Sequence, residues 1–237
     1  MKTLAIMQPY FLPYIGYFQL ISAVNCFVIY DNIQYTKKGW INRNRILVNG
    51  HTDWITIPIE KSSDYLDIRE KKISATFSRE KLIRRIESSY RKSPEFSNAF
   101  PFIKEIILFE STNLFDYIRH SIEKICLFLN IKTDLIISSE LDMNHQLRSQ
   151  QKVIEICKNI GANKYINPIG GTGLYNINDF MNEGIELIFF DAPKCHYKQF
   201  SQNFIPDLSI IDVLMFNEKN RVEEIIKEPY YAHQYQI

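Results

Sequence analysis

Residues 7–18, MQPYFLPYIGYF, decide how this chain begins to fold. They follow a short apolar run, residues 4–6, and contain two prolines. Pro9 and Pro13 fix φ and remove two backbone donors, which excludes regular helix or central strand until Pro13 is passed. Gly16 then permits a close backbone approach where the next helix begins. A strand, a stiff aromatic loop and a helix start together form the place where an α/β protein holds a ligand.

The segments on either side of this loop predict a parallel βαβ unit. Residues 4–7 have the apolar character of a first strand, and residues 15–24 are expected to form a helix behind it. Residues 26–30, CFVIY, are a near-continuous apolar run of strand length, which is typical of a sheet covered on both faces. Two strands joined by a crossover of helix length favour right-handed parallel pairing. Asp31 follows the second strand, at the end where functional side chains collect.

The later chain alternates helices and strands around an inserted helical region. Residues 62–132 carry apolar side chains at helical spacing, Leu82, Ile83, Ile86 and Tyr90 among them. Strands are expected at 135–137, 164–167 and 185–190, and helices at 147–160, at 178–182 and from near Ser209 and Asn217. The pattern predicts one α/β domain over residues 1–237, with a doubly wound, mainly parallel sheet, a β-hairpin and the helical insert at about 62–132.

The hairpin is expected around Asn49-Gly50. Residues 46–48 and 54–58 are the apolar runs that flank this dipeptide. Asn and Gly suit the two positive-φ positions of a type I′ turn, although a longer loop also fits the spacing.

Composition places the chain among globular proteins of a reducing cytoplasm. Hydrophobic residues fill 46% of the 237 positions, enough for a sizeable core, and the net charge of +1 gives no global reason to expect nucleic acid or an anionic membrane as partner. No apolar run reaches the ~18 residues of a membrane span, and residues 1–7 lack the features of a signal peptide. Cys26, Cys126 and Cys157 lie in apolar patterns without C-x-x-C spacing, so we expect free thiols and no metal site.

A basic stretch, residues 34–45 (QYTKKGWINRNR), is the first candidate for chemistry. It carries four cations and no acid, and Trp40 lies among them. A solvated face is one interpretation of such a run. In an extended segment, period two places Arg43 and Arg45 on one face and the neighbouring asparagines on the other. An arginine pair suits the grip of phosphate or carboxylate through forked donors, while the near-neutral whole argues against nucleic acid.

The glycine-rich stretch after the strand at 164–167 is the second candidate. Gly170, Gly171 and Gly173 are three of the eight glycines, and a Gly-Gly-x-Gly turn resembles loops whose N–H groups cradle phosphate at a helix start. The stretch lacks the spacing of a dinucleotide fingerprint and the Lys-Ser/Thr of a P-loop. A plain tight turn explains it equally well.

Side chains suited to acid–base or nucleophilic chemistry are few. Asp31 is a candidate base or cation ligand, although an aspartate after a strand is often a turn residue. His145 is a candidate proton shuttle. Ser209 and Asp212 have the spacing of a capping box, which favours a structural part for both. The sequence therefore indicates a binding site more clearly than a catalytic one.

Several stretches together resemble the WbqC-like family. They are QPYFLPYIGYF (8–18), YDNIQY (30–35), WINRNR (40–45) and parts of residues 165–175 and 206–214, which spread over almost the whole chain. The resemblance implies a bacterial cytoplasmic protein encoded among genes for O-antigen, the polysaccharide of lipopolysaccharide, or for other surface polysaccharides. It also implies transfer of glycine or another acyl group to an amino sugar, without established catalytic residues to carry over.

A more distant likeness links the order of strand, loop, helix and apolar strand to nucleotidylyltransferases that have a His-x-Gly-His loop. Tyr17 stands where such an enzyme needs a histidine. This departure argues against nucleotidyl transfer and leaves nucleotide binding open, and Mg²⁺ is expected only if a nucleotidyl group is transferred.

These observations lead to one hypothesis for the site. The protein is expected to transfer an acyl or aminoacyl group, glycyl included, from an activated donor to the amino group of a nucleotide-linked sugar, with no further cofactor. Attack requires a neutral amine, so Asp31 or His145 would accept its proton. The residues expected to bind phosphate, base, sugar and oxyanion are Gln8, Tyr10, Tyr17, Lys38, Trp40, Asn42, Arg43, Arg45, Asn167 and the backbone amides of Gly170 and Gly171.

Two alternatives stay open beside this hypothesis. One is a non-catalytic protein that binds a nucleotide-sugar or a carrier, and the other is a nucleotidyltransferase-like enzyme. The expected partner is a small nucleotide-sugar, and an acyl-carrier protein is a further candidate. The sequence sets no oligomeric state.

Overall fold

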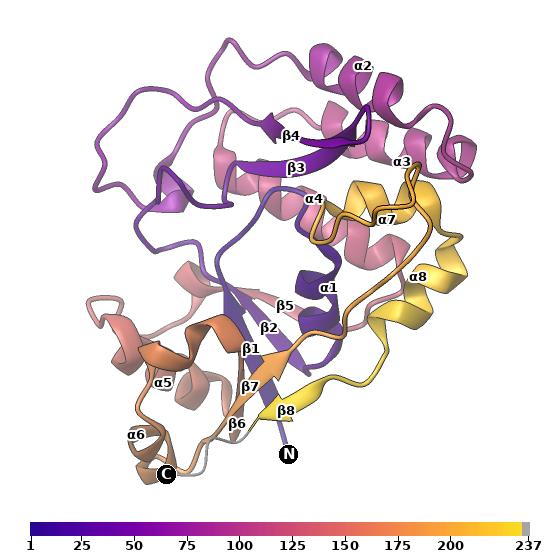
Figure 1. Ribbon diagram of the computed structural model, residues 1–237. Coiled ribbons are helices and arrows are strands. Elements are labelled where there is room, and N and C mark those ends of the chain that lie inside the picture. Colours follow the sequence, from indigo (N-terminus) through magenta and orange to yellow (C-terminus); the bar gives the residue numbers. More distant parts are fainter. Residues whose placement is uncertain (234–237) are drawn as a thin grey trace.

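The computed structural model describes residues 1–233, and its main sheet has the strand order β5-β2-β1-β6-β7-β8 (Figure 1). Strands β1 to β7 in this sheet are parallel, and β8 runs antiparallel to β7. Their bounds are β1 (Thr3–Met7), β2 (Cys26–Ile29), β5 (Asp134–Ile137), β6 (Lys164–Pro168), β7 (Glu186–Asp191) and β8 (Tyr231–His233). The doubly wound, mainly parallel sheet predicted from the sequence is confirmed. Strand β8 was not predicted.

Two sets of helices cover the two faces of this sheet. Helices α1 (Ile15–Ser22) and α8 (Lys219–Ile226) pack on one face, and α5 (Ser149–Ile160) and α6 (Ile177–Asn182) pack on the other. Along β1, Ala5 belongs to the core under α1, whereas Leu4 and Ile6 belong to the core under α5. Since both faces are buried, the strands read as continuous apolar runs rather than as alternating ones.

Between β2 and β5 the chain leaves the sheet and builds a second layer over its carboxyl edge (Figure 1). This layer contains the hairpin β3 (Arg43–Val48) and β4 (His51–Thr56), followed by α2 (Arg79–Tyr90), α3 (Phe96–Leu108) and α4 (Leu114–Phe128). Asn49 and Gly50 form the hairpin turn with φ of 50° and 80°, both positive as a type I′ turn requires. The helical insert begins at Arg79, later than predicted, because residues 57–78 hold only one short 3₁₀ turn.

The C-terminal helices begin where the sequence indicated, but one detail of the expected cap was wrong. Ser209 caps α7 (Ile210–Phe216), and its side chain accepts a hydrogen bond from the N–H of Ile211. Asp212 does not complete a capping box. Its buried carboxylate instead accepts hydrogen bonds from the hydroxyls of Tyr90 and Tyr197.

Three distant segments are tied together around the loop that follows β1. The N–H of Phe11 donates to the carbonyl of Ile41 over 3.0 Å. The amide of Asn44 donates to the carbonyls of Phe11 and Leu12 over 3.1 and 2.7 Å. Ser209 donates its hydroxyl to the same Leu12 carbonyl over 2.7 Å. The loop therefore has one fixed shape, although Leu12 takes a positive φ of 43°.

Asn44→Ala should lower the free energy of unfolding by about 2–3 kcal/mol, because it removes two buried hydrogen bonds and leaves carbonyl groups of the loop without this partner. Urea unfolding followed by circular dichroism measures the change. Asn220→Ala, at an exposed position of α8, is the matched control and should stay within about 0.5 kcal/mol of the wild type. Equal stability of the two variants would contradict the tie described above.

Candidate functional site

The sheet topology points to one edge for ligand binding. From β1 the chain crosses over to β2 on one side, whereas from β6 it crosses over to β7 on the other side. Because neighbouring strands β1 and β6 send their connections in opposite directions, a crevice opens at their carboxyl ends, where α/β proteins bind ligands. The loop of residues 8–14 and the glycine-rich turn after β6 border this edge.

A pocket of about 380 Å³, which we call the hairpin pocket, lies where the loop after β1 meets the hairpin. Its walls are Met7, Tyr10, Pro13, Tyr14, Trp40, Asn44, Arg45 and Asp207. These residues come from β1 and its loop, from the approach to β3 and β3 itself, and from the segment before α7. The ties that hold residues 11–13 against Asn44 and Ser209 therefore also shape this pocket.

The two predicted arginines lie on the same face of β3 but do different things. Arg43 donates to the backbone carbonyls of Gly39 and Lys38 over 3.0 and 2.6 Å, and its guanidinium stacks 4.4 Å from the centre of the Trp54 ring. These hydrogen bonds hold the loop that precedes β3 against the hairpin. Arg45 donates to the backbone carbonyl of Asp207 over 3.2 Å, while its Nε is buried without a hydrogen-bond partner in the part of the chain that the structure describes.

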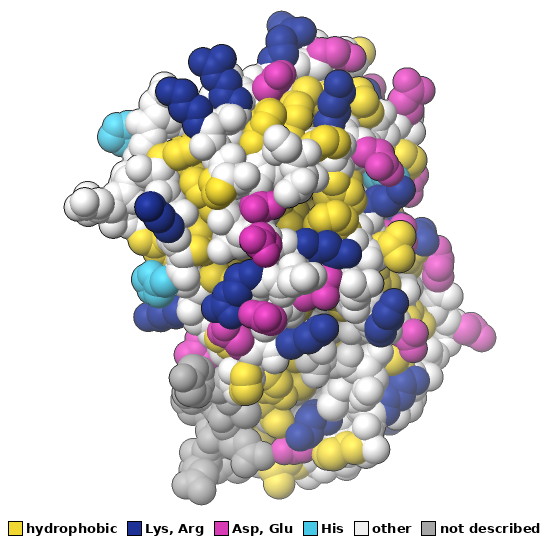
Figure 2. All heavy atoms as spheres, turned by 90° about the vertical axis from the view of Figure 1, so that its right-hand side faces the viewer, with side chains coloured by type: hydrophobic (Ala, Val, Ile, Leu, Met, Phe, Trp, Pro, Cys, Tyr) yellow, Lys and Arg dark blue, Asp and Glu magenta, His cyan; other side chains and the backbone are white. Residues whose placement is uncertain are grey.

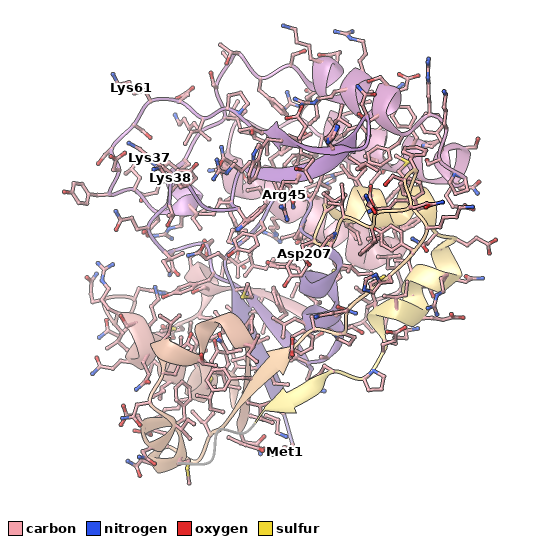
Figure 3. All side chains as sticks on the ribbon, viewed as in Figure 1. Met1, Lys37, Lys38, Arg45, Lys61 and Asp207 are labelled. Atoms are coloured by element: carbon pink, nitrogen blue, oxygen red, sulfur yellow. The ribbon has the colours of Figure 1, made fainter. Side chains whose placement is uncertain are left out.

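Arg45 is thus the cation with unused donor capacity in the hairpin pocket. Its guanidinium lies 5.3 Å from the centre of the Trp40 ring. Figure 3 shows Arg45 beside Asp207, between the hairpin and α1, whereas Lys37 and Lys38 extend from the loop at the far left. The structure does not bring Lys38 to Arg45.

Aromatic side chains supply most of the remaining wall. Trp40 is 38% exposed and contacts Trp54, with ring centres 5.2 Å apart. Burial raises the pKa of Tyr10, and burial followed by the nearby charge of Asp207 raises the pKa of Tyr14 to about 12. Both phenols therefore stay protonated at neutral pH and remain able to donate hydrogen bonds.

Two other predicted binding residues, Tyr17 and Asn42, face the interior. Tyr17 is 1% exposed, and its hydroxyl donates to the backbone carbonyl of Gln8 over 3.0 Å. Asn42 is also buried; it accepts a hydrogen bond from the Tyr35 hydroxyl and donates to the Ile57 carbonyl. Tyr17 and Asn42 thus support the loop and the hairpin. The side chain of Gln8 is half-buried at the end of β1.

The predicted glycine turn forms a 3₁₀ helix, Ile169–Leu174, rather than an open loop. Asn167 is buried and accepts a hydrogen bond from the Tyr165 hydroxyl over 2.9 Å. A side chain at Gly171 would collide with the Asn167 amide, because a Cβ there would lie 2.1 Å from its nitrogen. Gly170 has open space around it. Gly171 is therefore required by packing against Asn167, and these residues line none of the hairpin pocket.

The two predicted catalytic residues belong to adjacent groups of hydrogen bonds at the carboxyl ends of β2 and β5, which we call the buried network. Asp31 bonds to Ser139, and the half-buried His145 bonds to Asn32, the next residue after Asp31. Asp31 is 1% exposed, and its two carboxylate oxygens accept from the N–H and hydroxyl of Ser139 over 2.9 and 2.6 Å. His145 lies 2.9 Å from the Leu141 carbonyl through Nε2 and 3.0 Å from the Asn32 amide through Nδ1. Because a carbonyl can only accept, Nε2 carries the proton and the lone pair of Nδ1 is engaged by Asn32.

Sequence reasoning missed the lysine at the centre of this network. Lys152 is 4% exposed; its Nζ donates to the backbone and side-chain oxygens of Asn32, both over 3.1 Å, and lies 4.8 Å from the Tyr30 ring centre. Desolvation lowers the pKa of Lys152. A lysine on the same helix face as Val153 and Ile156 was the available signal.

Five residues of the hairpin pocket were not among the predicted binding residues, namely Met7, Pro13, Tyr14, Asn44 and Asp207. Asp207 follows Pro206 and has a positive φ of 55°, which projects it beside Arg45. The available signal was its place in a stretch, residues 206–214, that shares the family pattern.

Among residues 1–233, no group of three or more His, Cys, Asp or Glu side chains is placed to hold a metal ion. Within the same residues, no helix combines the length and the apolar character that crossing a membrane demands.

The titration of Lys152 gives a test of the buried network. Its folded-state pKa lies below the ordinary 10.5, so between these two values the unfolded chain binds more protons and stability rises with pH. Lys152→Met removes this titration. Urea unfolding at pH 7 to 10 should show the wild type gaining stability relative to this variant as the pH rises. A difference that stays constant over this range would contradict the burial of a charged amine.

Comparison with known proteins shows which family the chain belongs to. Residues 8–224 match the family described as WbqC-like protein family. The chain is 33% identical over 220 residues to the uncharacterized protein Rv1507c of Mycobacterium tuberculosis (strain ATCC 25618 / H37Rv), covering 92% of this chain and 94% of that protein. No solved structure gives a significant match. Since the match spans nearly the whole length, the resemblance found in the sequence is confirmed, and the chain belongs to the WbqC-like family.

Proposed function

We propose that the protein binds a nucleotide-linked amino sugar in the hairpin pocket and transfers an acyl or aminoacyl group, glycyl among the candidates, to its amino group. The reaction would serve bacterial surface-polysaccharide (O-antigen) synthesis in the cytoplasm. One observation carries the proposal. The guanidinium of Arg45 has a buried, unused Nε donor on the wall of a pocket that Tyr10, Tyr14 and Trp40 also line.

The unused donor supports an anionic ligand. A buried donor without a partner costs about 1–3 kcal/mol, and a phosphate oxygen on Arg45 would remove this penalty through a charge-assisted hydrogen bond. Arg43 is less suited to this role, because it does not line the hairpin pocket and two of its donors already bond to backbone carbonyls. The phosphate part of the proposed ligand therefore rests on Arg45 alone.

The aromatic wall supports a ligand with flat or ring-shaped groups. Trp40 exposes more than a third of its surface, and Tyr10 is partly exposed beside it in the same pocket. Aromatic faces bind nucleobases by stacking, and the protonated phenols of Tyr10 and Tyr14 could donate hydrogen bonds to sugar or phosphate oxygens. A volume of about 380 Å³ suits a ligand of nucleotide size.

Asp207 is the carboxylate that lines the pocket. We propose that it acts as the base that accepts the proton of the reacting amine. The amine nitrogen would attack the carbonyl carbon of the activated donor and form the new N–C bond. The donor's leaving group would depart with the electron pair of its bond to that carbon, and the proton lost by nitrogen would pass to Asp207. Asp31 and His145 are poorly suited to this step, because hydrogen bonds within the buried network engage both carboxylate oxygens and Nδ1.

The same engagement of Asp31 and His145 favours a second candidate, a non-catalytic protein that binds a nucleotide-sugar or a carrier such as an acyl-carrier protein. Nucleotidyl transfer has no such support, because Tyr17, at the position of the required histidine, is buried and bonded to Gln8.

Arg45→Ala should weaken binding of nucleoside diphosphates and their amino sugars at least tenfold, about 1.4 kcal/mol, because it removes the phosphate donor of the hairpin pocket. Calorimetric titration of uridine, thymidine and guanosine derivatives measures the dissociation constants. Arg84→Ala, which deletes an exposed arginine of α2, is the matched control and should bind as the wild type does. Binding that is absent from the wild type, or equal in both variants, would refute the nucleotide part of the proposal.

Mass spectrometry of the surface glycan separates the transferase from the binding protein. A strain that lacks the gene should lose one acyl or aminoacyl mass from its glycan. Complementation with the wild-type gene should restore this mass, and the Asp207→Asn gene should not, although the variant protein still binds the nucleotide. If the Asp207→Asn gene fully restores the glycan, Asp207 is not the base of a transfer reaction and the non-catalytic binding protein is the function that stands.

A further inference from the structure

A second cavity of about 380 Å³ lies behind the hairpin pocket, between α1 and the irregular segment of residues 192–208, which we call the strap. Tyr14, Ile15, Gly16 and Gln19 form its floor, and strap residues including Lys194, Cys195 and His196 form its cover. The strap runs along the right-hand side of Figure 1, and Figure 2 shows that this side mixes acidic, basic and hydrophobic side chains. We call this space the strap cavity.

One part of the strap cavity suits an anion. Helix α1 begins after Tyr14 with no side-chain cap and with no acidic residue in its first turn. Ile15 and Gly16, its first residues, line the cavity, and so does Lys194. The antiparallel bridge between Tyr14 and Ser209 engages the N–H of Ile15, so the Gly16 N–H and the Lys194 ammonium are the groups that would attract a carboxylate or phosphate.

One turn further along the helix, Gln19 presents the opposite chemistry. Its side chain is 2% exposed, and its Nε2 donates to the carbonyls of Pro193 and Ile225 over 3.4 and 3.1 Å. These two acceptors fix the amide orientation, because the reversed amide would set oxygen against oxygen. The Oε1 atom is left buried without a partner among residues 1–233. A donor from water or from a ligand in the cavity would satisfy this buried acceptor.

Negative charge surrounds the same region. Asp207 lines the strap cavity as well as the hairpin pocket, and the charges of Asp207 and Asp191 both act on the hydroxyl of Tyr14. Because Asp207 lines the cavity together with Gln19, its carboxylate would attract a ligand donor that also carries a positive charge. A primary ammonium has both properties.

We propose that the strap cavity is a second ligand site, for a small molecule that carries a primary ammonium near an anionic group. The anion would lie at the start of α1 with Lys194, and the ammonium would donate to Gln19. Tyr14 and Asp207 belong to both cavities, so the two ligands would meet at these side chains. We assign the activated donor to the strap cavity, and this assignment of the donor rests on the proposed transfer, whereas the presence of a second ligand site does not.

Two sources offer this chemistry, namely amino acids and amino-sugar phosphates. The probes are therefore a panel of natural amino acids and glucosamine 6-phosphate, each titrated by calorimetry beside its amine-free analogue, such as glycerate for serine and glucose 6-phosphate for glucosamine 6-phosphate. At least one amine-bearing probe should bind ten times more tightly than its analogue. If no probe binds at millimolar concentration, or if the analogues bind equally well, the proposal is overturned.

Variants locate the binding. Gln19→Leu should weaken binding of the probe at least tenfold, whereas Arg84→Ala, at an exposed position of α2 outside both cavities, should leave it unchanged. Unaltered binding by Gln19→Leu would overturn the proposal. Cys195→Trp, which places a large side chain at another position of the cavity wall, gives the same test if Gln19→Leu fails to fold. Titration with nucleotides measures binding in the hairpin pocket alone. Loss of nucleotide binding would therefore contradict the proposed function, and loss of amine-probe binding would contradict the second site.

Discussion

The carbonyl groups of Phe11 and Leu12 are the constraint on which the functional edge of this molecule depends. Their segment lies between Pro9 and Pro13, neither of which can donate a hydrogen bond, and it enters neither the sheet nor α1. The carbonyls are paired instead by the side chains of Asn44 and Ser209, from segments 32 and 197 positions away. Because side chains make these bonds, the loop, the hairpin and the start of α7 can only be ordered together.

Because Asn44 of the hairpin holds the loop after β1, the insertion between β2 and β5 forms part of the candidate site itself. A doubly wound sheet usually leaves its carboxyl edge to loops. Here the hairpin covers that edge (Figure 1), and β3 supplies at successive positions a buried asparagine that bonds to the loop and an arginine with an unused donor, both of which line the pocket. The period-two alternation of a strand thus joins the structural and the binding residues in one short segment.

The sequence predicted the fold well because the fold rests on local patterns. The apolar runs of β2 and β7, the Asn49-Gly50 turn and the stop of α5 at Gly161 each follow from side-chain chemistry within a few residues. The site was harder, because its geometry depends on distant contacts. Arg43 and Arg45 look alike in sequence. The structure shows that Arg43 bonds to two backbone carbonyls of the preceding loop, whereas the Nε of Arg45 has no hydrogen-bond partner among the described residues. Likewise, nothing near Asp31 in sequence indicates that Ser139 engages its carboxylate.

The pairing of Trp40 with Trp54 has a spectroscopic consequence. These are the only two tryptophans in the sequence. Trp54 lies on β4 and Trp40 in the loop before β3, with Arg43 beside the Trp54 ring and Arg45 beside the Trp40 ring. The indole emission of the whole protein therefore originates within a few ångströms of the hairpin pocket. The molecule carries its own optical probe of that pocket, while the strap cavity, lined by no tryptophan, is not reported directly.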